Sequence, residues 1–328
     1  MPAHELVAEV WRSGFLESVH YGSVVALNSS GEPVVAVGDV TAPMFPRSSN
    51  KPFQTLAMLR SGLDLDGELL ALATASHSGE EFHLDGVRRI LASAGLDESA
   101  LQCTPAKPIG EAALRAYLAA GGEDSRLHMN CSGKHAAMLA TCVAAGWPID
   151  TYRDPEHPLQ RAIRDVIAEL TGEPVAAVGV DGCGAPVFAV SLTGLARGFG
   201  RIASAPPGTL ERRVADAMRA HPEWVGGTGP ERKDTVLMQR IPGLIAKDGA
   251  EAVSAVGLPD GGAVAVKIGD GTGSRARTVV AVAALRRLGV DVSPVEELAT
   301  EPVLGHGEKV GEVRPAGALA VEPALRSS

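Results

Sequence analysis

Several features are scarce in this sequence, and each scarcity excludes a class of protein. Its 328 residues include only four cysteines, at positions 103, 131, 142 and 183, too few and too irregular for a disulfide framework. No uninterrupted apolar segment is long enough to cross a bilayer, and no basic stretch precedes an apolar one at the N-terminus. We therefore expect a cytoplasmic protein with reduced thiols and no membrane partner.

Basic and aromatic residues are also few. The chain has 30 lysines and arginines against 39 acidic residues, a formal net charge of −9, and only 4% aromatic residues. A polyanion such as nucleic acid is excluded as a partner, because no basic run or aromatic-basic stripe is present. With 45% hydrophobic and 21% charged residues the composition is that of an ordinary globular protein. A small polar molecule is the expected substrate.

The hydrophobic pattern predicts an α+β fold. Strand signals occur at 6–10, 23–27 and 34–37, and again at 175–180, 252–256 and 263–268, with the run at 175–180 expected to be buried. Helical spacing dominates between them, at 53–59, 87–91, 112–118, 136–143 and 163–170, and returns at 192–196, 210–218 and 278–288. No repeat or linker divides the chain. We expect one catalytic unit of two packed lobes: N- and C-terminal strands forming a sheet (1–47 and 173–328) and a mostly helical middle (48–172).

The first candidate for chemistry is a serine that precedes a lysine by three residues. Ser48 and Lys51 lie at the start of a predicted helix, where side chains three apart are neighbours. A serine hydroxyl needs a base to become a nucleophile, and a lysine can be that base if burial or nearby positive charge lowers its pKa. Arg47 or a second lysine would supply such charge. By itself this spacing occurs by chance in many proteins.

Three polar clusters and one lysine strengthen the case. The clusters are residues 75–83 (ASHSGEEFH), 128–135 (HMNCSGKH) and 181–186 (DGCGAP), and Lys267 lies near the end of an apolar strand, followed by Ile268 and a glycine. The order Ser48-x-x-Lys51, then Ser78, then K-x-G at Lys267 is that of serine β-lactamases and penicillin-binding enzymes. However, Ile268 stands where those enzymes carry Thr or Ser, and no Asp-Asn pair follows Ser78, which argues against penicillin chemistry.

Together these motifs resemble the Asparaginase II family, the class 3 L-asparaginases. The similarity extends over nearly the whole chain, and residues 128–135 are its most specific part. The resemblance implies a β-lactamase-like fold, a homodimer, and two serine–lysine pairs in one site, Ser48 with Lys51 and Ser78 with Lys267. It also implies a metal-binding group formed by Cys131, Lys134 and Cys183.

From this resemblance we expect hydrolysis of the side-chain amide of L-asparagine. Ser48 would attack with Lys51 as its base, Ser78 and Lys267 would carry the proton that lets ammonia leave, and water would hydrolyse the aspartyl-enzyme. Two lysines in one pocket lower each other's proton affinity. The candidate substrate-binding residues are Arg47, His135, Asp181 and Arg275. A zinc ion would orient substrate or tune affinity without being essential for the chemistry, since thiolates favour Zn²⁺.

Three alternatives remain open. One is a serine hydrolase of penicillin or peptide substrates on the same fold. A second is a thiol amidase in which Cys131 is the nucleophile and His135 its base. A third is an amino-acid-binding protein without catalytic activity. The preference between asparagine and glutamine is also open.

Overall fold

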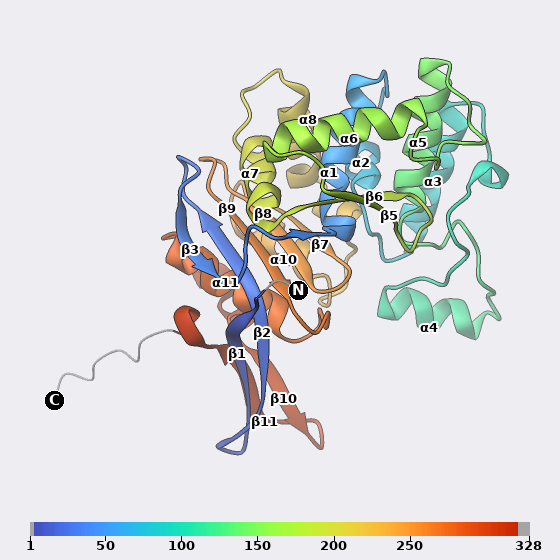
Figure 1. Cartoon of the computed structure of the whole chain (residues 1–328). Coiled ribbons are helices and arrows are strands. Elements are labelled where there is room, and N and C mark those ends of the chain that lie inside the picture. The colour runs from blue at the N-terminus through green and yellow to red at the C-terminus, as the bar shows by residue number, and fades with distance from the viewer. Residues whose placement is uncertain (1–2, 321–328) are drawn as a thin grey trace.

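A large antiparallel sheet forms one side of the molecule. The computed structural model describes residues 3–320, and Figure 1 shows the sheet beside a group of helices. The strand order is β10-β11-β1-β2-β9-β8-β7, with β3 pairing to β2. The bounds are β1 Glu5–Arg12, β2 Phe15–Leu27, β3 Pro33–Val37, β7 Ile245–Gly249, β8 Val253–Gly257, β9 Ala263–Ile268, β10 Glu301–Gly305 and β11 Glu308–Pro315. Strands from both ends of the chain therefore build one sheet, as predicted.

The sheet is covered by helices around its middle and projects beyond them at one end. Strands β8 and β9 are buried at almost every position, so both of their faces are covered: α7 (Leu192–Ala203) and α11 (Ala276–Arg287) pack on them. The first half of β2 pairs only with β1, and its exposed residues include Phe15, Val19 and Tyr21. These strands form an arm that extends away from the helices (Figure 1).

The helical part lies against the other end of the sheet. Its helices are α1 Lys51–Arg60, α2 Gly67–Ala73, α3 Glu81–Ser93, α4 Glu111–Ala119, α5 Ser132–Ala145, α6 Pro158–Thr171, α8 Leu210–Ala220, α9 Pro222–Val225 and α10 Lys233–Arg240. Proline begins α6 and a glycine with positive φ ends it, which are the usual helix start and stop signals. Helices α8 and α9 pack on α2. The helical part therefore draws on residues beyond 172, past the boundary that the sequence pattern suggested.

A second, three-stranded sheet corrects one sequence prediction. It has the order β4-β6-β5, with β4 at Pro43–Met44, β5 at Ala177–Val180 and β6 at Pro186–Ser191. The apolar run at 175–180 was expected to be buried, but β5 is an edge strand and Val180 is 79% exposed. The buried strand is β6, the next one along the chain. The place of a strand in the sheet decides whether it is buried, and β6 lies between β4 and β5, whereas β5 has a neighbour on one side only. The local hydrophobicity of the sequence does not contain this information.

The fold class, the cysteines and the lengths of the helices can each be compared with the sequence predictions. The predicted α+β arrangement, with terminal strands in a sheet and helices in the middle, is confirmed. All four cysteines are buried free thiols. Within residues 3–320, no helix has both the length and the apolar character that a membrane crossing requires.

Candidate active site

Ser48 lies on a tight turn that leads directly into α1. Residues Arg47–Asn50 form a short 3₁₀ helix, and α1 begins at Lys51 with Pro52 in its first turn. Arg47 has a φ of +53°, a left-handed conformation that costs energy for a residue other than glycine and is often found at functional sites. The strained residue turns the chain immediately before Ser48. The serine is partly exposed, whereas Ser49 and Asn50 are buried.

Lys51 is buried directly behind this turn. Its side chain is 1% exposed, and its Nζ donates hydrogen bonds to the backbone oxygen of Ala75, to Ser76 Oγ at 2.9 Å and to Cys131 Sγ at 3.0 Å. Burial lowers the pKa of Lys51 because the ammonium is removed from water. Lys51 is therefore in the environment expected for a base. However, the serine to which it donates a hydrogen bond is Ser76, not the predicted Ser48.

A second buried lysine reaches the same serine. Lys247 is on β7 and fully buried, and its Nζ donates to Ser76 Oγ at 3.0 Å and to the backbone oxygen of Asp248 at 2.8 Å. The carboxylate of Asp234 lies 3.7 Å from the same Nζ. Burial lowers the pKa of Lys247 to about 7, with Asp234 opposing the shift and Lys51 reinforcing it. Ser76 Oγ is thus held between two lysines of reduced proton affinity.

This arrangement corrects the second pair predicted from the sequence. Ser78 and Lys267 do not meet: Ser78 Oγ donates to the backbone oxygen of Gly226 at 3.0 Å. Lys267 lies on β9 and donates to the backbone oxygens of Glu251 and Ile268, at 2.6 and 2.8 Å. The physical reason is topological. β9 is inside the sheet, two strands from the edge strand β7, which lies against the Ser48 turn.

The sequence contained a signal for the residues that were missed. Lys247-Asp248-Gly249 is also a K-x-G strand end, and Ser76 is only two positions from Ser78. Choosing between the two lysines requires the strand order. Choosing between the two serines requires knowing which of them faces α1.

Ser48 and Ser76 open into a common hollow, which we call the Ser48 cavity. It measures about 240 Å³ and is lined by Ser48, Ser76, Ile109, Asn130, Glu231, Arg232, Asp234, Asp248, Gly249, Ala250 and Arg277. That volume equals about eight water molecules at ~30 Å³ each, which suits a ligand of amino-acid size. Its lining is rich in charge of both signs, so a zwitterion is a better match than an apolar molecule.

Most of the lining charges form ion pairs at the wall of the cavity. Arg277 donates to Asp248 Oδ2 at 2.5 Å, and Arg232 lies 3.8 Å from Asp234 Oδ2. Arg232 also donates to the backbone oxygen of Ser76 at 2.7 Å. The Nε atoms of both arginines are buried and have no partner among residues 3–320. These arginines were not among the residues singled out from the sequence.

The four predicted substrate-binding residues lie outside this lining. Arg47 forms an ion pair with Asp181 at 2.8 Å, behind the turn that carries Ser48. Arg275 lines an adjoining hollow, which shares Glu231 and Arg277 with the Ser48 cavity. His135 is fully buried on α5, where its Nδ1 is hydrogen bonded to Tyr152 Oη at 2.6 Å. Arg47 and Asp181 are placed to fix the Ser48 turn, and the arginines that face the cavity are Arg232 and Arg277 instead.

The predicted metal ligands meet in one cluster, which we call the sulfur cluster: Cys131, Lys134 and Cys183. Lys134 Nζ donates to Cys183 Sγ at 3.1 Å. The neighbouring Cys131 side chain lowers the pKa of Cys183, and the Lys134 ammonium adds to this effect. Burial alone would lower the pKa of Lys134, but the two sulfurs raise it. Among residues 3–320 no group of three His, Cys, Asp or Glu side chains is arranged to hold a metal, so a metal here would need the lysine nitrogen.

The glycine at the end of β7 allows a close backbone approach. A Cβ at Gly249 would lie 2.7 Å from the backbone oxygen of Pro46 and 3.4 Å from the nitrogen of Ser48. Contacts this short are not tolerated. The absence of a side chain therefore lets the edge strand pack against the Ser48 turn and keeps Lys247 and Ser48 at one cavity.

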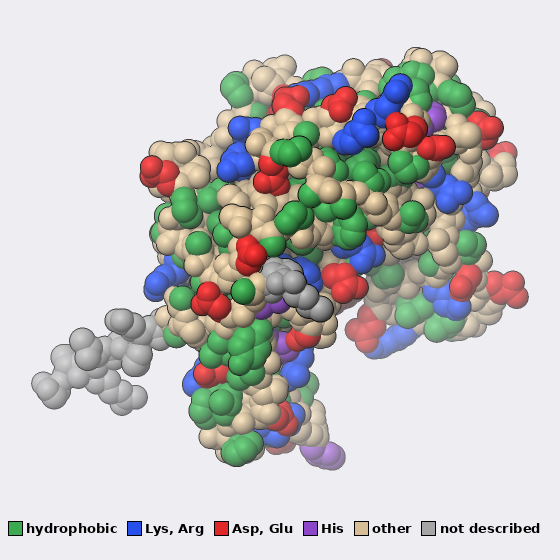
Figure 2. All heavy atoms as spheres, viewed as in Figure 1, with side chains coloured by type: hydrophobic (Ala, Val, Ile, Leu, Met, Phe, Trp, Pro, Cys, Tyr) green, Lys and Arg blue, Asp and Glu red, His purple; other side chains and the backbone are tan. Residues whose placement is uncertain are grey.

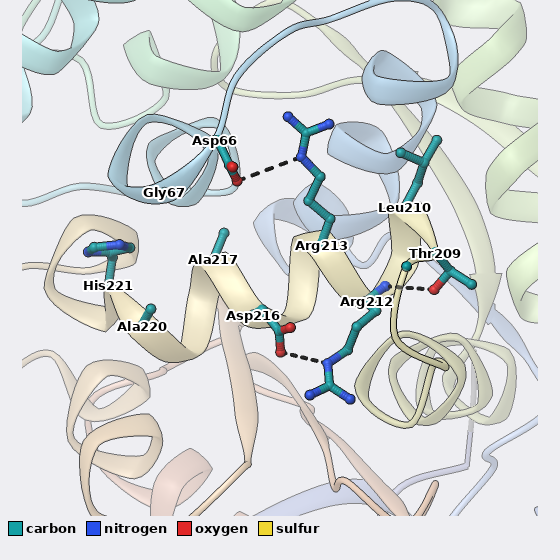
Figure 3. A pocket seen from close by; sticks show the side chains of 11 residues that line it. Asp66, Gly67, Thr209, Leu210, Arg212, Arg213, Asp216, Ala217, Ala220 and His221 are labelled. Carbon is teal, nitrogen blue, oxygen red and sulfur yellow. Dashed lines mark hydrogen bonds and ion pairs between the residues drawn. The ribbon is translucent and has the colours of Figure 1, made fainter.

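A larger hollow on the surface is not built for chemistry. It measures about 550 Å³ and lies between α8 and the start of α2, as Figure 3 shows. Arg212 pairs with Asp216 at 2.7 Å, and Arg213 lies 3.6 Å from Asp66. Its charged side chains thus form ion pairs with one another. The smaller Ser48 cavity, with its buried lysines and unpartnered arginine nitrogens, is the better candidate for a reacting site.

The fold and this cavity define a hydrolase-like site, with serine hydroxyls next to buried lysines of lowered pKa. Comparison with protein-family models then identifies the family: the model described as L-asparaginase II matches residues 8–315. This chain belongs to the L-asparaginase II family. The resemblance stated from the sequence motifs is therefore confirmed.

Comparisons with individual proteins add little beyond the family. No curated protein matches the chain. Among solved structures, Mglu in its native form has 14% sequence identity and a TM-score of 0.41, with 79% of this chain and 62% of Mglu covered. EstCE1, described as a hydrolase with promiscuous acyltransferase activity, has 14% identity and a TM-score of 0.37, with 86% of this chain and 93% of EstCE1 covered. At TM-scores below 0.5, neither likeness informs the chemistry of this chain.

Proposed function

We propose that this protein hydrolyses the side-chain amide of L-asparagine to L-aspartate and ammonia through an acyl-enzyme on Ser48. One observation carries the proposal: Ser76 Oγ is held by Lys51 and Lys247 at 2.9 and 3.0 Å, at a cavity that Ser48 also lines. A hydroxyl between two lysines can pass a proton when one lysine is neutral. Ser48 is the more exposed of the two serines, so it is the better placed to reach a substrate.

The reaction can be followed as proton transfers among these groups. Ser48 Oγ attacks the amide carbon, and its proton moves to the Lys51 and Ser76 pair. The same pair returns a proton to the amide nitrogen as the C–N bond breaks, so ammonia leaves and an aspartyl ester remains on Ser48. Water then attacks the ester, gives up a proton to the same groups, and Ser48 is restored. A neutral lysine is needed near pH 7, and burial of Lys247 provides it.

The thiol alternative is less well supported. Cys131 is 3% exposed and does not line the Ser48 cavity. Its sulfur contacts Lys51 and Asn130, while His135 is hydrogen bonded to Tyr152. No hydrogen bond joins His135 to Cys131 among residues 3–320, so this histidine is not positioned to activate the thiol.

The sulfur cluster fits a thiophilic metal such as Zn²⁺, because two thiols and one amine converge behind Lys51. Cys131, Lys134 and Cys183 would hold the ion only after losing their protons, and the raised pKa of Lys134 means that the ion would have to displace the proton of its ammonium. A bound ion there would supply positive charge behind Lys51. None of the three residues lines the Ser48 cavity. We therefore propose that the metal adjusts substrate affinity, while serine provides the nucleophile and lysine the base.

The test is an ammonia-release screen of the purified protein with asparagine, glutamine and simple aliphatic amides. We expect release from asparagine, and no release by a Ser48→Ala variant that retains the fold. The screen with glutamine measures the preference that the sequence left open. Activity on none of these amides would reject the proposed function, and a Ser48→Ala protein with wild-type activity would reject the nucleophile.

A further inference from the structure

One carboxylate on the wall of the Ser48 cavity is not used by the site described above. Of the three acidic side chains in the lining, Asp234 and Asp248 are buried in ion pairs with cations of the site. Glu231 is exposed and has no ion pair among residues 3–320, and its one hydrogen bond is a long contact of 3.4 Å from the backbone nitrogen of Glu111. Its carboxylate lies beside Gly229, and Glu231 lines both the Ser48 cavity and a neighbouring hollow. Because no cation among residues 3–320 pairs with it, its charge is available to a ligand.

Glu231 is held in place by a loop that is itself clamped. The glycine loop, residues 226–230, precedes it, and Thr228 donates from its backbone nitrogen and Oγ1 to the Glu80 carboxylate at 2.9 and 2.6 Å. Ser78 donates to the backbone oxygen of Gly226 at 3.0 Å. Two residues of the motif at 75–83 thus position the loop. After it, Arg232 N donates to the backbone oxygen of Gly229 at 3.0 Å, which makes a tight turn around Glu231.

The charges of the cavity are arranged to match a free amino acid. Arg232 and Arg277 both line the cavity, and a guanidinium suits a carboxylate. Glu231 offers the complementary negative charge, and Ser48 and Ser76 lie in the same cavity. A ligand with an amide at the serines and a carboxylate at the arginines needs one more partner for its α-ammonium.

We infer that Glu231 binds the α-ammonium group of the substrate and is the residue that selects free α-amino acids over amides without an amino group. This inference rests on the proposed function, and it names the recognition element of that same site. Glu80 is a positioning residue, because it acts on Glu231 through Thr228 and the glycine loop. The binding step changes no bond and needs no further reactant.

The experiment compares two substrates that differ only in the ammonium. L-Asparagine and succinamate share the amide and the carboxylate, and succinamate lacks the amino group. In Glu231→Gln we expect kcat/KM for asparagine to fall ~10- to 100-fold, mainly through KM, because a hydrogen bond between charged groups is lost. For succinamate we expect a change within about twofold. Glu231→Asp should recover part of the loss, and Glu80→Gln should show a smaller, equally selective loss.

Glu111→Gln is the matched control, since Glu111 is an exposed neighbouring carboxylate that pairs with Arg115 and does not line the cavity. It should leave both substrates unaffected. An equal loss for both substrates in Glu231→Gln would show a structural role and overturn the inference, as would an unchanged KM for asparagine.

A binding measurement separates this inference from the proposed reaction. Calorimetric titration with L-aspartate and with succinate reports recognition of the ammonium without turnover. We expect the wild-type protein to bind aspartate more tightly than succinate, and Glu231→Gln to remove the difference. That result would support the inference even if no ammonia were released, in which case only the reaction would be rejected. Equal affinity of the wild-type protein for the two ligands, or no binding of either, would overturn the inference.

Discussion

At the scale of single residues, the account rests on a serine and a lysine that act as one unit. Ser48→Ala and Lys51→Ala should each lower kcat on the order of 10⁴-fold or more, and the double variant should be hardly worse than either, because removing one member already disables the other. The measurement is steady-state kinetics on all three variants, with circular dichroism to verify folding. Additive losses, or near wild-type activity in Lys51→Ala, would contradict the assignment.

Lys247 gives a prediction for pH dependence. Burial is the main cause of its lowered pKa, Asp234 on α10 and Asp248 on β7 raise that pKa, and Lys51 on α1 and Arg232 lower it, with a net value of about 7. Because the neutral amine is the active form, kcat/KM should rise as the pH increases through about 7 and then level off. Below that pH the ammonium cannot accept a proton.

The variants Lys247→Met and Lys247→Arg test this assignment together. Both should lose activity by roughly 10²- to 10⁴-fold and lose the rise near pH 7, because neither provides a neutral amine. The arginine keeps the positive charge, so it separates charge from proton transfer. A retained rise near pH 7 in either variant would assign that titration to another group.

The sulfur cluster leads to a prediction for metal removal. Cys131 Sγ donates to Asn130 Oδ1 at 3.0 Å, and Asn130 lines the Ser48 cavity. A metal-bound thiolate cannot donate this hydrogen bond, so metal binding should change the position of Asn130 and hence substrate affinity. Chelation should then change KM more than kcat, measured with the metal removed and restored. A complete loss of kcat that Zn²⁺ restores would make this a metallohydrolase instead.

Some residues of the site could be predicted from the sequence, and others could not. Ser48 and Lys51 could be placed from a local motif at the start of a helix, whereas the sulfur cluster was expected only from the family resemblance. Lys247 could not, since Lys267 has the same K-x-G pattern and a more apolar strand. Only the strand order shows that β7, and not β9, borders the Ser48 turn. Arg232, Arg277 and Glu231 had no distinguishing local signal.

At the scale of elements, the contact between β7 and the turn before α1 is the critical one. Gly249→Ala would place a Cβ 2.7 Å from the backbone oxygen of Pro46, so β7 should move away from the turn. A displacement of about 1 Å at a reacting site can lower the rate ~100-fold, and we expect a loss of about 10- to 100-fold in kcat with the fold retained.

Gly31→Ala is the control for this substitution. Gly31, unlike Gly249, has a positive φ, of +80°, and no atom lies within 4 Å of an added Cβ. It should cost some stability and leave kcat unchanged. Full activity in Gly249→Ala, measured beside this control, would show that the close approach of β7 does not matter for catalysis.

The elements also show what hydrophobic pattern can and cannot predict. The long amphipathic helix α6 and the apolar strand β9 were found at nearly their observed positions, because each has a strong period of its own. β10 and β11 were missed because they carry charged and proline residues at exposed positions. Their pairing is set by partners far away in the sequence, which a local pattern does not contain.

At the scale of the whole molecule, the projecting arm carries exposed apolar side chains. Phe15 is 73% exposed and Tyr21 54% exposed, and Val19 lies between them, also exposed, on the same part of β2. Apolar side chains lie over this arm in Figure 2. Exposed apolar patches of this kind mark interaction sites in soluble proteins. We propose that a second copy of this chain covers them.

Light scattering coupled to size-exclusion chromatography tests the proposed dimer. We expect the wild-type protein to have the mass of a dimer and the double variant Phe15→Asp, Val19→Asp that of a monomer. Leu118→Asp is the control, because Leu118 is a similarly exposed apolar residue (51%) on α4, away from the arm. A wild-type monomer, or a dimer that survives the double substitution, would contradict this use of the arm.

The central claim is that an aspartyl ester forms on Ser48 during turnover. The direct measurement is acid quenching of the enzyme at steady state with L-asparagine, followed by peptide mass spectrometry. The account predicts a mass increase of one aspartyl group on the peptide that contains Ser48, with fragment ions assigning it to that side chain, and no such adduct in Ser48→Ala. An adduct on Ser76 or Cys131, or ammonia release by Ser48→Ala at the wild-type rate, would contradict it.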